Sequence, residues 1–113
     1  DVLLQENASR ERSKFGLDPA ELEAFATDVS RLDRLRIRGL MTIGLFTDDP
    51  DLARPSLRQL RELSAQMREL NLEGVEIDEL SMGMSGDLEV AIEEGATIIR
   101  VGTAVFGERD TPE

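Results

Sequence analysis

The run Ser-Met-Gly-Met-Ser-Gly-Asp at residues 81–87 follows one apolar segment, and the run Gly-Thr-Ala-Val-Phe-Gly, which begins fifteen residues further on at Gly102, follows another. Both runs stand where a buried strand is expected to give way to a loop or to the start of a helix. Each offers small side chains, hydroxyl groups and backbone N–H groups. This combination is typical of a cradle for a phosphate group, because N–H groups at a helix start favour an anion.

The segments around these runs alternate between strand and helix patterns. Short apolar segments predict strands at residues 2–7, 36–44, 76–81 and 97–102. Helical spacing of apolar residues predicts helices between them, at residues 18–32, from the aspartate-rich turn at 48–51 to about residue 71, and at 86–95. This order predicts an α/β fold with about four parallel strands and right-handed crossovers.

The candidate ligand residues follow several strands in succession, which favours a strand-helix barrel over a doubly wound sheet with one glycine-rich turn. A closed barrel of this type has eight strands and about 250 residues, so a chain of 113 residues corresponds to one half of it. We expect residues 1–107 to form this half of a TIM-type (β/α)8 barrel and residues 108–113 to form a loose tail. The open sheet edges need a partner, either a missing amino-terminal half or a second copy of the chain.

Composition excludes several classes of function. The chain carries 13 basic and 24 acidic residues, and its net charge of −11 argues against binding to nucleic acid or to an anionic membrane. It has no apolar stretch of about eighteen residues and does not begin with a signal-peptide pattern, so we expect a cytoplasmic protein. Because Cys and His are absent, thiol nucleophiles, disulfides and the usual zinc ligands are excluded. The carboxylates are scattered along predicted helices, which does not predict a metal site.

Lysine is unusually rare. Lys14 is the only lysine among the 13 basic residues, and the other twelve are arginines. Any amine chemistry within this chain therefore depends on Lys14 or on the amino terminus, although a plain exposed loop residue is the alternative interpretation of Lys14.

The chain resembles the carboxyl-terminal half of the pyridoxal phosphate homeostasis proteins, which are single-domain relatives of the alanine racemase barrel. The resemblance rests on Ser-Met-Gly-Met-Ser-x-Asp at 81–87 together with Arg-x-Gly-Thr-x-x-Phe-Gly at 100–107. It extends over essentially the whole chain through Gln5, Asn7, Lys14, Gly16 and the run Arg-Gly-Leu-Met at 38–41. It implies a carrier of pyridoxal 5′-phosphate in vitamin B6 homeostasis that catalyses no reaction of its own.

The resemblance also implies roles for individual residues. It places the cofactor phosphate on Ser85, Gly102 and Thr103. It brings Arg100 to the pyridine nitrogen, where a cation keeps that nitrogen unprotonated and makes the cofactor a poor electron sink. The remaining members of the implied site are Ser81, at the start of the first run, Met84, beneath the ring, and Lys14, which accepts the aldehyde during transfer.

Structural alternatives stand beside these roles. Ser85 could be a plain helix N-cap, Arg100 a strand arginine paired with an acidic neighbour, and Met84 a core methionine. Asp87 opposes the phosphate interpretation, because its charge in the first turn of the helix would repel an anion unless the side chain caps the helix and faces away.

One departure from the family pattern is large. The Schiff-base lysine of the family lies on the first strand of the full barrel, in a segment that this sequence does not contain.

Two further functions remain open. An amino-acid racemase of the alanine racemase type would need a second acid-base residue, usually a tyrosine, and this chain has no tyrosine. A self-associating half-barrel that binds only phosphate is the other.

Overall fold

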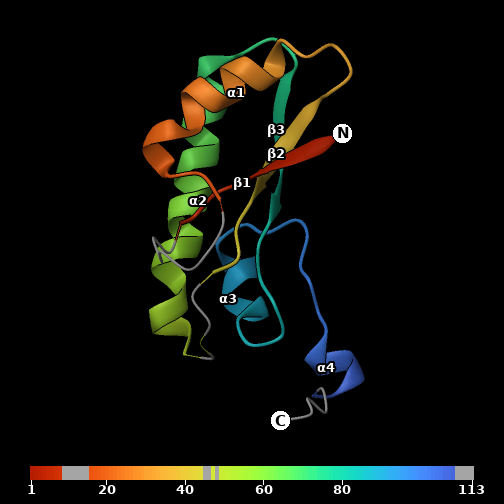
Figure 1. Cartoon of the computed structure of the whole chain (residues 1–113). Coiled ribbons are helices and arrows are strands. Elements are labelled where there is room, and N and C mark those ends of the chain that lie inside the picture. The colour runs from red at the N-terminus through yellow and green to blue at the C-terminus, as the bar shows by residue number, and fades with distance from the viewer. Residues whose placement is uncertain (9–15, 45–46, 48, 109–113) are drawn as a thin grey trace.

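The computed structural model describes residues 1–8, 16–44, 47 and 49–108. Its parallel sheet has the order β1-β2-β3, formed by Val2–Gln5, Ile37–Met41 and Val75–Ser81. Helix α1 (Leu22–Ser30) connects β1 to β2, helix α2 (Pro50–Leu70) connects β2 to β3, and both helices lie against one face of the sheet (Figure 1). The predicted alternation of strand and helix, and the parallel sheet, are confirmed.

Helix boundaries follow the capping residues. A short 3-10 helix, Pro19–Glu21, precedes α1 and is capped by Asp18, whose Oδ1 accepts from the Ala20 N–H at 3.0 Å. Asp49 caps α2 in the same way, since its Oδ1 accepts from the Asp51 N–H at 2.9 Å. The chain leaves α2 at Asn71, which takes the left-handed conformation with φ 50°. Two shorter helices follow, α3 (Leu88–Glu93) and α4 (Thr103–Phe106).

The hydrophobic core lies between the sheet and the helices. Ile37 and Leu40 of β2 and Leu57 and Leu60 of α2 are fully buried there. Burial of large aliphatic side chains contributes about 1.5–3 kcal/mol each relative to exposure. This layer fixes the positions of β2 and β3 and hence of the loops that follow them.

The predicted fourth strand at residues 97–102 is wrong as a regular strand. The segment pairs with β3 through one isolated parallel bridge, between Ser81 and Ile98. The Leu80 N–H donates to the Thr97 hydroxyl at 2.9 Å, so the backbone pairing of this segment with β3 cannot extend toward the start of β3. Beyond the bridge the Arg100 N–H donates to the Gly83 carbonyl at 2.9 Å, but Gly83 has φ +103°, so the backbone after β3 is not extended there. A side chain and a left-handed glycine therefore limit the pairing on both sides.

The loops that carry the two glycine- and serine-containing runs meet at one end of the molecule. Strands β2 and β3 both run toward α3 and α4, and the segment before α4 returns beside the end of β3 (Figure 1). The carboxyl ends of parallel strands share one edge of a sheet, so residues far apart in sequence become neighbours there.

Candidate phosphate-binding site

The structure brings the two runs into contact. The Ser85 Oγ accepts a hydrogen bond from the backbone N–H of Ala104 at 3.0 Å, across nineteen residues of sequence. Gly102 is the N-cap of α4, and Thr103 is its first residue. Within the described part of the chain, the N–H groups of Ser85, Gly86, Gly102 and Thr103 donate to no other protein group. Four donors therefore remain for an outside acceptor.

Two glycines of the runs have different functions. A Cβ on Gly83 would lie 2.6 Å from the Cβ of Ala91, and φ at Gly83 is +103°, so only glycine fits without strain. Gly102 has φ −112°, and a Cβ there would meet no atom within 4 Å. Gly83 is thus required by packing, whereas Gly102 keeps the approach to the backbone at the start of α4 open.

Asp87 does not cap α3. From the sequence, such a cap was expected to turn the carboxylate away from a bound phosphate. Its side chain makes no capping hydrogen bond to that helix. Instead its Oδ1 accepts from the Met84 N–H at 2.7 Å, and its own N–H donates to the Met84 carbonyl at 3.1 Å. The carboxylate is therefore committed to the turn that presents Ser85 and Gly86.

Arg100 lies at the same end of the sheet. Its Nη2 donates to the backbone carbonyl of Thr42 at 2.6 Å, while its Nε is buried and has no acceptor among the described residues. Burial lowers the pKa of Arg100, and the carboxylate of Asp87 acts in the opposite direction. The alternative interpretation, a strand arginine paired with an acidic neighbour, stays open: the described residues form no salt bridge with Arg100, but the charge of Asp87 acts on it.

The other predicted site residues are Ser81, Met84 and Lys14, and they differ in burial and in whether the structure describes them. Ser81 is buried at the end of β3, where its carbonyl accepts from the Thr42 N–H at 3.0 Å. Met84 is 43% exposed, so it is not a core methionine, while its neighbour Met82 is fully buried. Lys14 lies outside the described residues.

Two residues of this edge were not singled out from the sequence. Thr42 is fully buried, and its hydroxyl donates to the Glu6 carbonyl at 2.8 Å, which ties the ends of β1 and β2 together beneath Arg100. Glu6 is 1% exposed, and neither of its carboxylate oxygens accepts a hydrogen bond from the described residues. Each residue lies near the carboxyl end of a predicted strand, and that position was the available signal.

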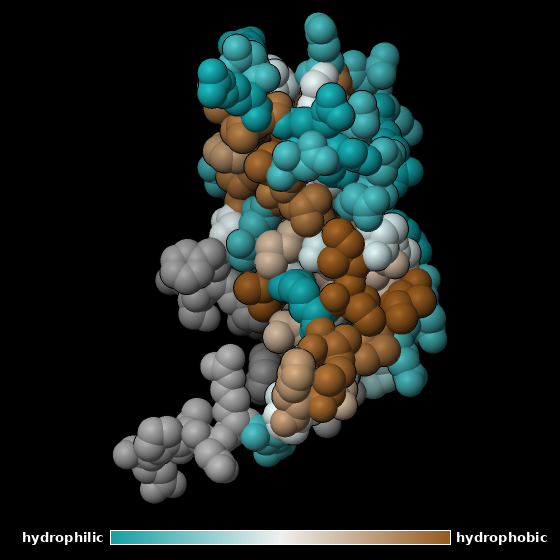
Figure 2. Space-filling model, turned by 90° about the vertical axis from the view of Figure 1, so that its right-hand side faces the viewer, coloured by the Kyte–Doolittle hydropathy of each residue, from teal (hydrophilic) through white to brown (hydrophobic). Residues whose placement is uncertain are grey.

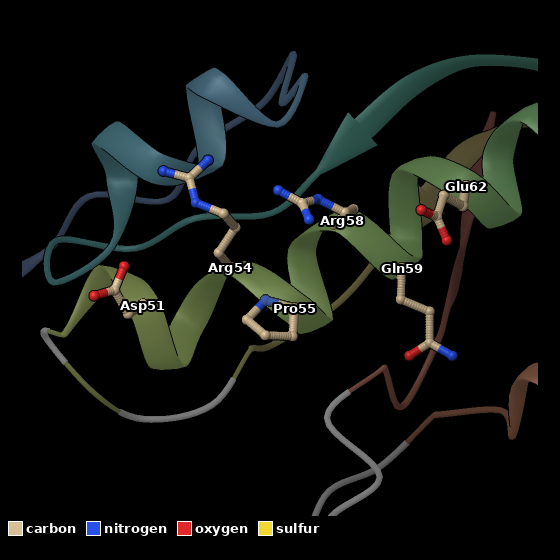
Figure 3. Close-up of a pocket in the computed structure, with 6 residues that line it drawn as sticks. All are labelled: Asp51, Arg54, Pro55, Arg58, Gln59 and Glu62. Atoms are coloured by element: carbon tan, nitrogen blue, oxygen red, sulfur yellow. The ribbon is translucent and has the colours of Figure 1, made fainter.

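A separate hollow lies along α2, away from the two runs. Figure 3 shows Arg54 and Arg58 extending from α2 toward α3. Arg54, Arg58 and Arg61 contact the buried carboxylate of Glu94 at 2.7, 3.5 and 2.9 Å, and Arg54 also contacts Glu93 at 2.7 Å. The hydrogen bond from Arg54 is the main cause of the lowered pKa of Glu94. These arginines link α2 to the end of α3. The hollow is lined by Asp51, Arg54, Pro55, Arg58, Gln59 and Glu62.

The arrangement at the strand ends offers several hydrogen-bond donors to a small anion. A phosphate accepts from several N–H groups at once, and the N–H groups of both runs are available for it. The Arg100 Nε supplies one further buried donor without an acceptor. Among the described residues, no group of three or more Asp or Glu could hold a metal ion. No described helix is long and apolar enough to cross a membrane.

Comparison with known proteins gives relatives over nearly the whole chain. The family described as "Alanine racemase, N-terminal domain" matches residues 1–110. The pyridoxal phosphate homeostasis protein of Vibrio cholerae is 48% identical to this chain over 96% of its length, and that of Pseudomonas aeruginosa is 49% identical over 97%. Each match covers 45% of the relative. The chain thus spans about half the length of the curated relatives it matches.

Solved structures agree with this relationship. A structure described as an unknown protein from Bifidobacterium adolescentis has a TM-score of 0.86 and 44% identity, over 93% of this chain and 42% of that one. PipY from Synechococcus elongatus, solved with pyridoxal phosphate bound, has a TM-score of 0.78 and 37% identity, over 93% of this chain and 48% of PipY. The chain therefore belongs to the alanine racemase N-terminal domain family, and its curated relatives within that family are pyridoxal phosphate homeostasis proteins.

Proposed function

We propose that this chain binds pyridoxal 5′-phosphate through the phosphate group and acts as part of a carrier that holds the cofactor without catalysing a reaction on it. The observation that carries the proposal is the 3.0 Å hydrogen bond between the Ser85 hydroxyl and the Ala104 N–H, which unites the two runs. The names of the curated relatives and the cofactor bound to PipY support the same ligand.

Ser85, Gly102 and Thr103 would hold the phosphate. The Ser85 oxygen accepts from Ala104, so its own O–H proton is free to be donated to a phosphate oxygen. The N–H groups of Gly102 and Thr103 approach from the start of α4, and those of Ser85 and Gly86 approach from the loop after β3. A dianion surrounded by N–H donors is stabilised by charge-assisted hydrogen bonds.

Arg100 would determine how the cofactor ring behaves. Pyridoxal phosphate supplies an electrophilic aldehyde and a pyridine ring that can withdraw electrons when its nitrogen is protonated. Arg100 is anchored on the Thr42 carbonyl, and its buried Nε–H lacks an acceptor, which suits a donor to an unprotonated ring nitrogen. An arginine in that position keeps the nitrogen without a proton, which makes the ring a weaker electron sink.

The remaining assignments complete the proposed site. Met84, which is exposed beside the loop, would pack against the ring, and Ser81 would support the loop from the end of β3. Lys14 would accept the aldehyde during transfer. The lysine that bonds the cofactor in the resting carrier would come from the other half of the barrel.

We further propose that residues 1–107 are the carboxyl-terminal half of a TIM-type barrel in a cytoplasmic protein, completed by an amino-terminal half. The face turned away from α1 and α2 carries a band of hydrophobic residues, as Figure 2 shows. An apolar hollow also follows the edge strand β1, lined by Val2, Leu3, Leu4, Gln5, Gly16, Leu17, Phe25, Val29 and Leu35.

Titration of the purified chain with pyridoxal phosphate tests the proposed function. We expect a saturable change in the cofactor absorbance that Ser85→Ala weakens by about ten-fold, because the hydroxyl group is both a donor and the link between the runs. Ser30→Ala is the matched control, since it removes a half-buried serine hydroxyl that donates to the Thr27 carbonyl far from the site. Equal binding by Ser85→Ala and the unsubstituted chain would refute the phosphate assignment.

Three further measurements separate the remaining assignments. Borohydride reduction followed by intact mass should give an adduct that Lys14→Ala removes, if Lys14 accepts the aldehyde. Racemisation of alanine by the loaded protein would contradict the carrier function. An apparent mass of about 25 kDa, twice 12.5 kDa, would indicate that a second copy completes the barrel in the absence of the other half.

A further inference from the structure

The carboxylate of Asp87 closes the loop that carries half of the proposed phosphate site. Its Oδ1 accepts from the Met84 N–H at 2.7 Å, and the Asp87 N–H donates to the Met84 carbonyl at 3.1 Å. Residues 85 and 86 form the tip of this turn. A bond from a charged acceptor is stronger than a neutral one, so the turn is held more firmly than a backbone turn alone.

The Asp87 side chain has no other structural task at the start of α3. Asp87 is the N-cap residue of this helix by position, yet its side chain makes no capping hydrogen bond to it. The backbone carbonyl of Asp87 accepts from the Ala91 N–H at 3.0 Å, a bond that any residue could make. The carboxylate therefore serves the loop before the helix.

The charge of Asp87 is offset by a nearby cation. The charge of Asp87 raises the pKa of Arg100 against the effect of burial. A Cβ on Gly44 would lie 3.5 Å from the Asp87 Oδ2, so the second oxygen lies beside the loop after β2. With Arg100 fixed on the Thr42 carbonyl at this same edge, the carboxylate can lie near an anion site at reduced electrostatic cost.

We propose that Asp87 is a positioning residue for the phosphate: its Oδ1 holds the Met84–Asp87 turn in the form that leaves the Ser85 and Gly86 N–H groups unpartnered and available to the anion. This inference rests on the proposed function and assigns Asp87 a role within it. The property that this role requires is an acceptor oxygen at position 87, and not a negative charge.

The test uses the backbone amide NMR spectrum of the chain, titrated with pyridoxine 5′-phosphate, a probe that has the phosphate and ring but no reactive aldehyde. We expect saturable shifts at Ser85, Gly86, Gly102 and Thr103 in the unsubstituted chain. Asp87→Ala should lose the shifts at Ser85 and Gly86, keep those at Gly102 and Thr103, and bind the probe about ten-fold more weakly.

Asp87→Asn provides the rescue. Its amide oxygen can accept from the Met84 N–H, so we expect all four shifts and an affinity at least equal to that of the unsubstituted chain, because a negative charge is removed. A purely structural role would lower the thermal stability of Asp87→Ala without changing which amides respond to the probe. Asp78→Ala, an exposed carboxylate of β3 that pairs with Arg38, is the matched control.

The possible failures are distinguishable. If Asp87→Ala keeps the Ser85 and Gly86 shifts, the positioning role is overturned while the phosphate site stands. If Asp87→Ala does not fold, Asp87→Asn decides, since loss of these two shifts in its folded form overturns the role of the acceptor. If the unsubstituted chain shows no shift in either run, the proposed function fails, and this inference fails with it.

Discussion

Glu6 is a single side chain whose burial gives the whole fold a pH dependence. It is 1% exposed, and neither oxygen has a hydrogen-bond partner among the described residues. Burial, followed by the charges of Asp18 and Glu21, raises the pKa of Glu6 from 4.5 to about 8. A buried carboxyl without partners is least costly when it is neutral, so the folded chain holds this proton near neutral pH.

This gives a prediction with a definite sign. In the unfolded chain Glu6 loses its proton near pH 4.5, whereas the folded chain keeps it to about pH 8. The stability that Glu6 contributes is therefore complete below about pH 4.5 and is lost progressively as the pH rises to about 8, by an amount on the order of a few kcal/mol. Urea unfolding across this range should show a decline that Glu6→Gln flattens. Glu73→Gln, at an exposed position, is the control, and an equal decline in Glu6→Gln would contradict the prediction.

Gly83 gives a second prediction at the scale of a residue. Gly83→Ala places a Cβ 2.6 Å from that of Ala91 at φ +103°, so we expect a loss of about 2–4 kcal/mol in the free energy of unfolding. Gly102→Ala, where a Cβ meets nothing within 4 Å, should cost less than about 1 kcal/mol in stability. Chemical denaturation of both variants checks this, and similar losses in the two would argue against the packing of Gly83.

At the scale of elements, the contact between α2 and α3 depends on one buried carboxylate. Glu94 is 3% exposed and is bound by Arg54, Arg58 and Arg61. These arginines are spaced four and three residues apart, which places them on one side of α2. Since α3 directly follows the loop of residues 82–87, this contact also anchors the helix next to that loop.

We expect Glu94→Ala to destabilise the chain by about 1–3 kcal/mol, because three partly exposed arginines lose their shared partner. The effect should shrink as the pH falls, since the pKa of Glu94 is lowered in the folded chain and its contribution disappears once the carboxylate is protonated. Glu93→Ala removes a carboxylate that is 62% exposed and has one arginine contact, so it should cost much less. Thermal unfolding at two pH values compares them, and equal losses would contradict a special role of the buried site.

At the scale of the whole molecule, the described part of the chain carries several exposed large hydrophobic side chains. Val105 and Phe106 of α4 are 67% and 85% exposed, and the sheet face away from α1 and α2 carries its own hydrophobic band (Figure 2). Contiguous exposed apolar patches are typical of surfaces that another polypeptide covers.

The chain by itself is therefore expected to self-associate as its concentration rises. Phe106→Ser should shift this equilibrium toward the monomer without loss of stability, because the side chain makes little contact within the chain. Sedimentation velocity over a wide concentration range measures the shift. Leu52→Ser, 58% exposed on α2, is the control, and an equal effect of both substitutions would show that association does not depend on α4.

Periodicity alone predicted most of the elements and their parallel order. The alternation of apolar strands with amphipathic helices gave three of the four strands and the helices α1, α2 and α3, because each pattern reflects burial of one face. The prediction of a fourth strand was wrong because a strand needs a paired neighbour: the Leu80 N–H donates to the Thr97 hydroxyl, and the left-handed Gly83 follows the end of β3. These are contacts between distant residues, which a local pattern does not contain.

The site divides in the same way. The sequence by itself determined the two phosphate-type runs, the family and the exclusion of His and Cys chemistry, since these depend on residue identity and local order. Only the tertiary structure decided that Ser85 contacts Ala104, that Arg100 rests on Thr42, that Asp87 closes its own loop and that Glu6 is buried. The physical reason is that hydrogen-bond partners and desolvation arise when the strand ends are brought together, and neither is encoded in the spacing of residues along the chain.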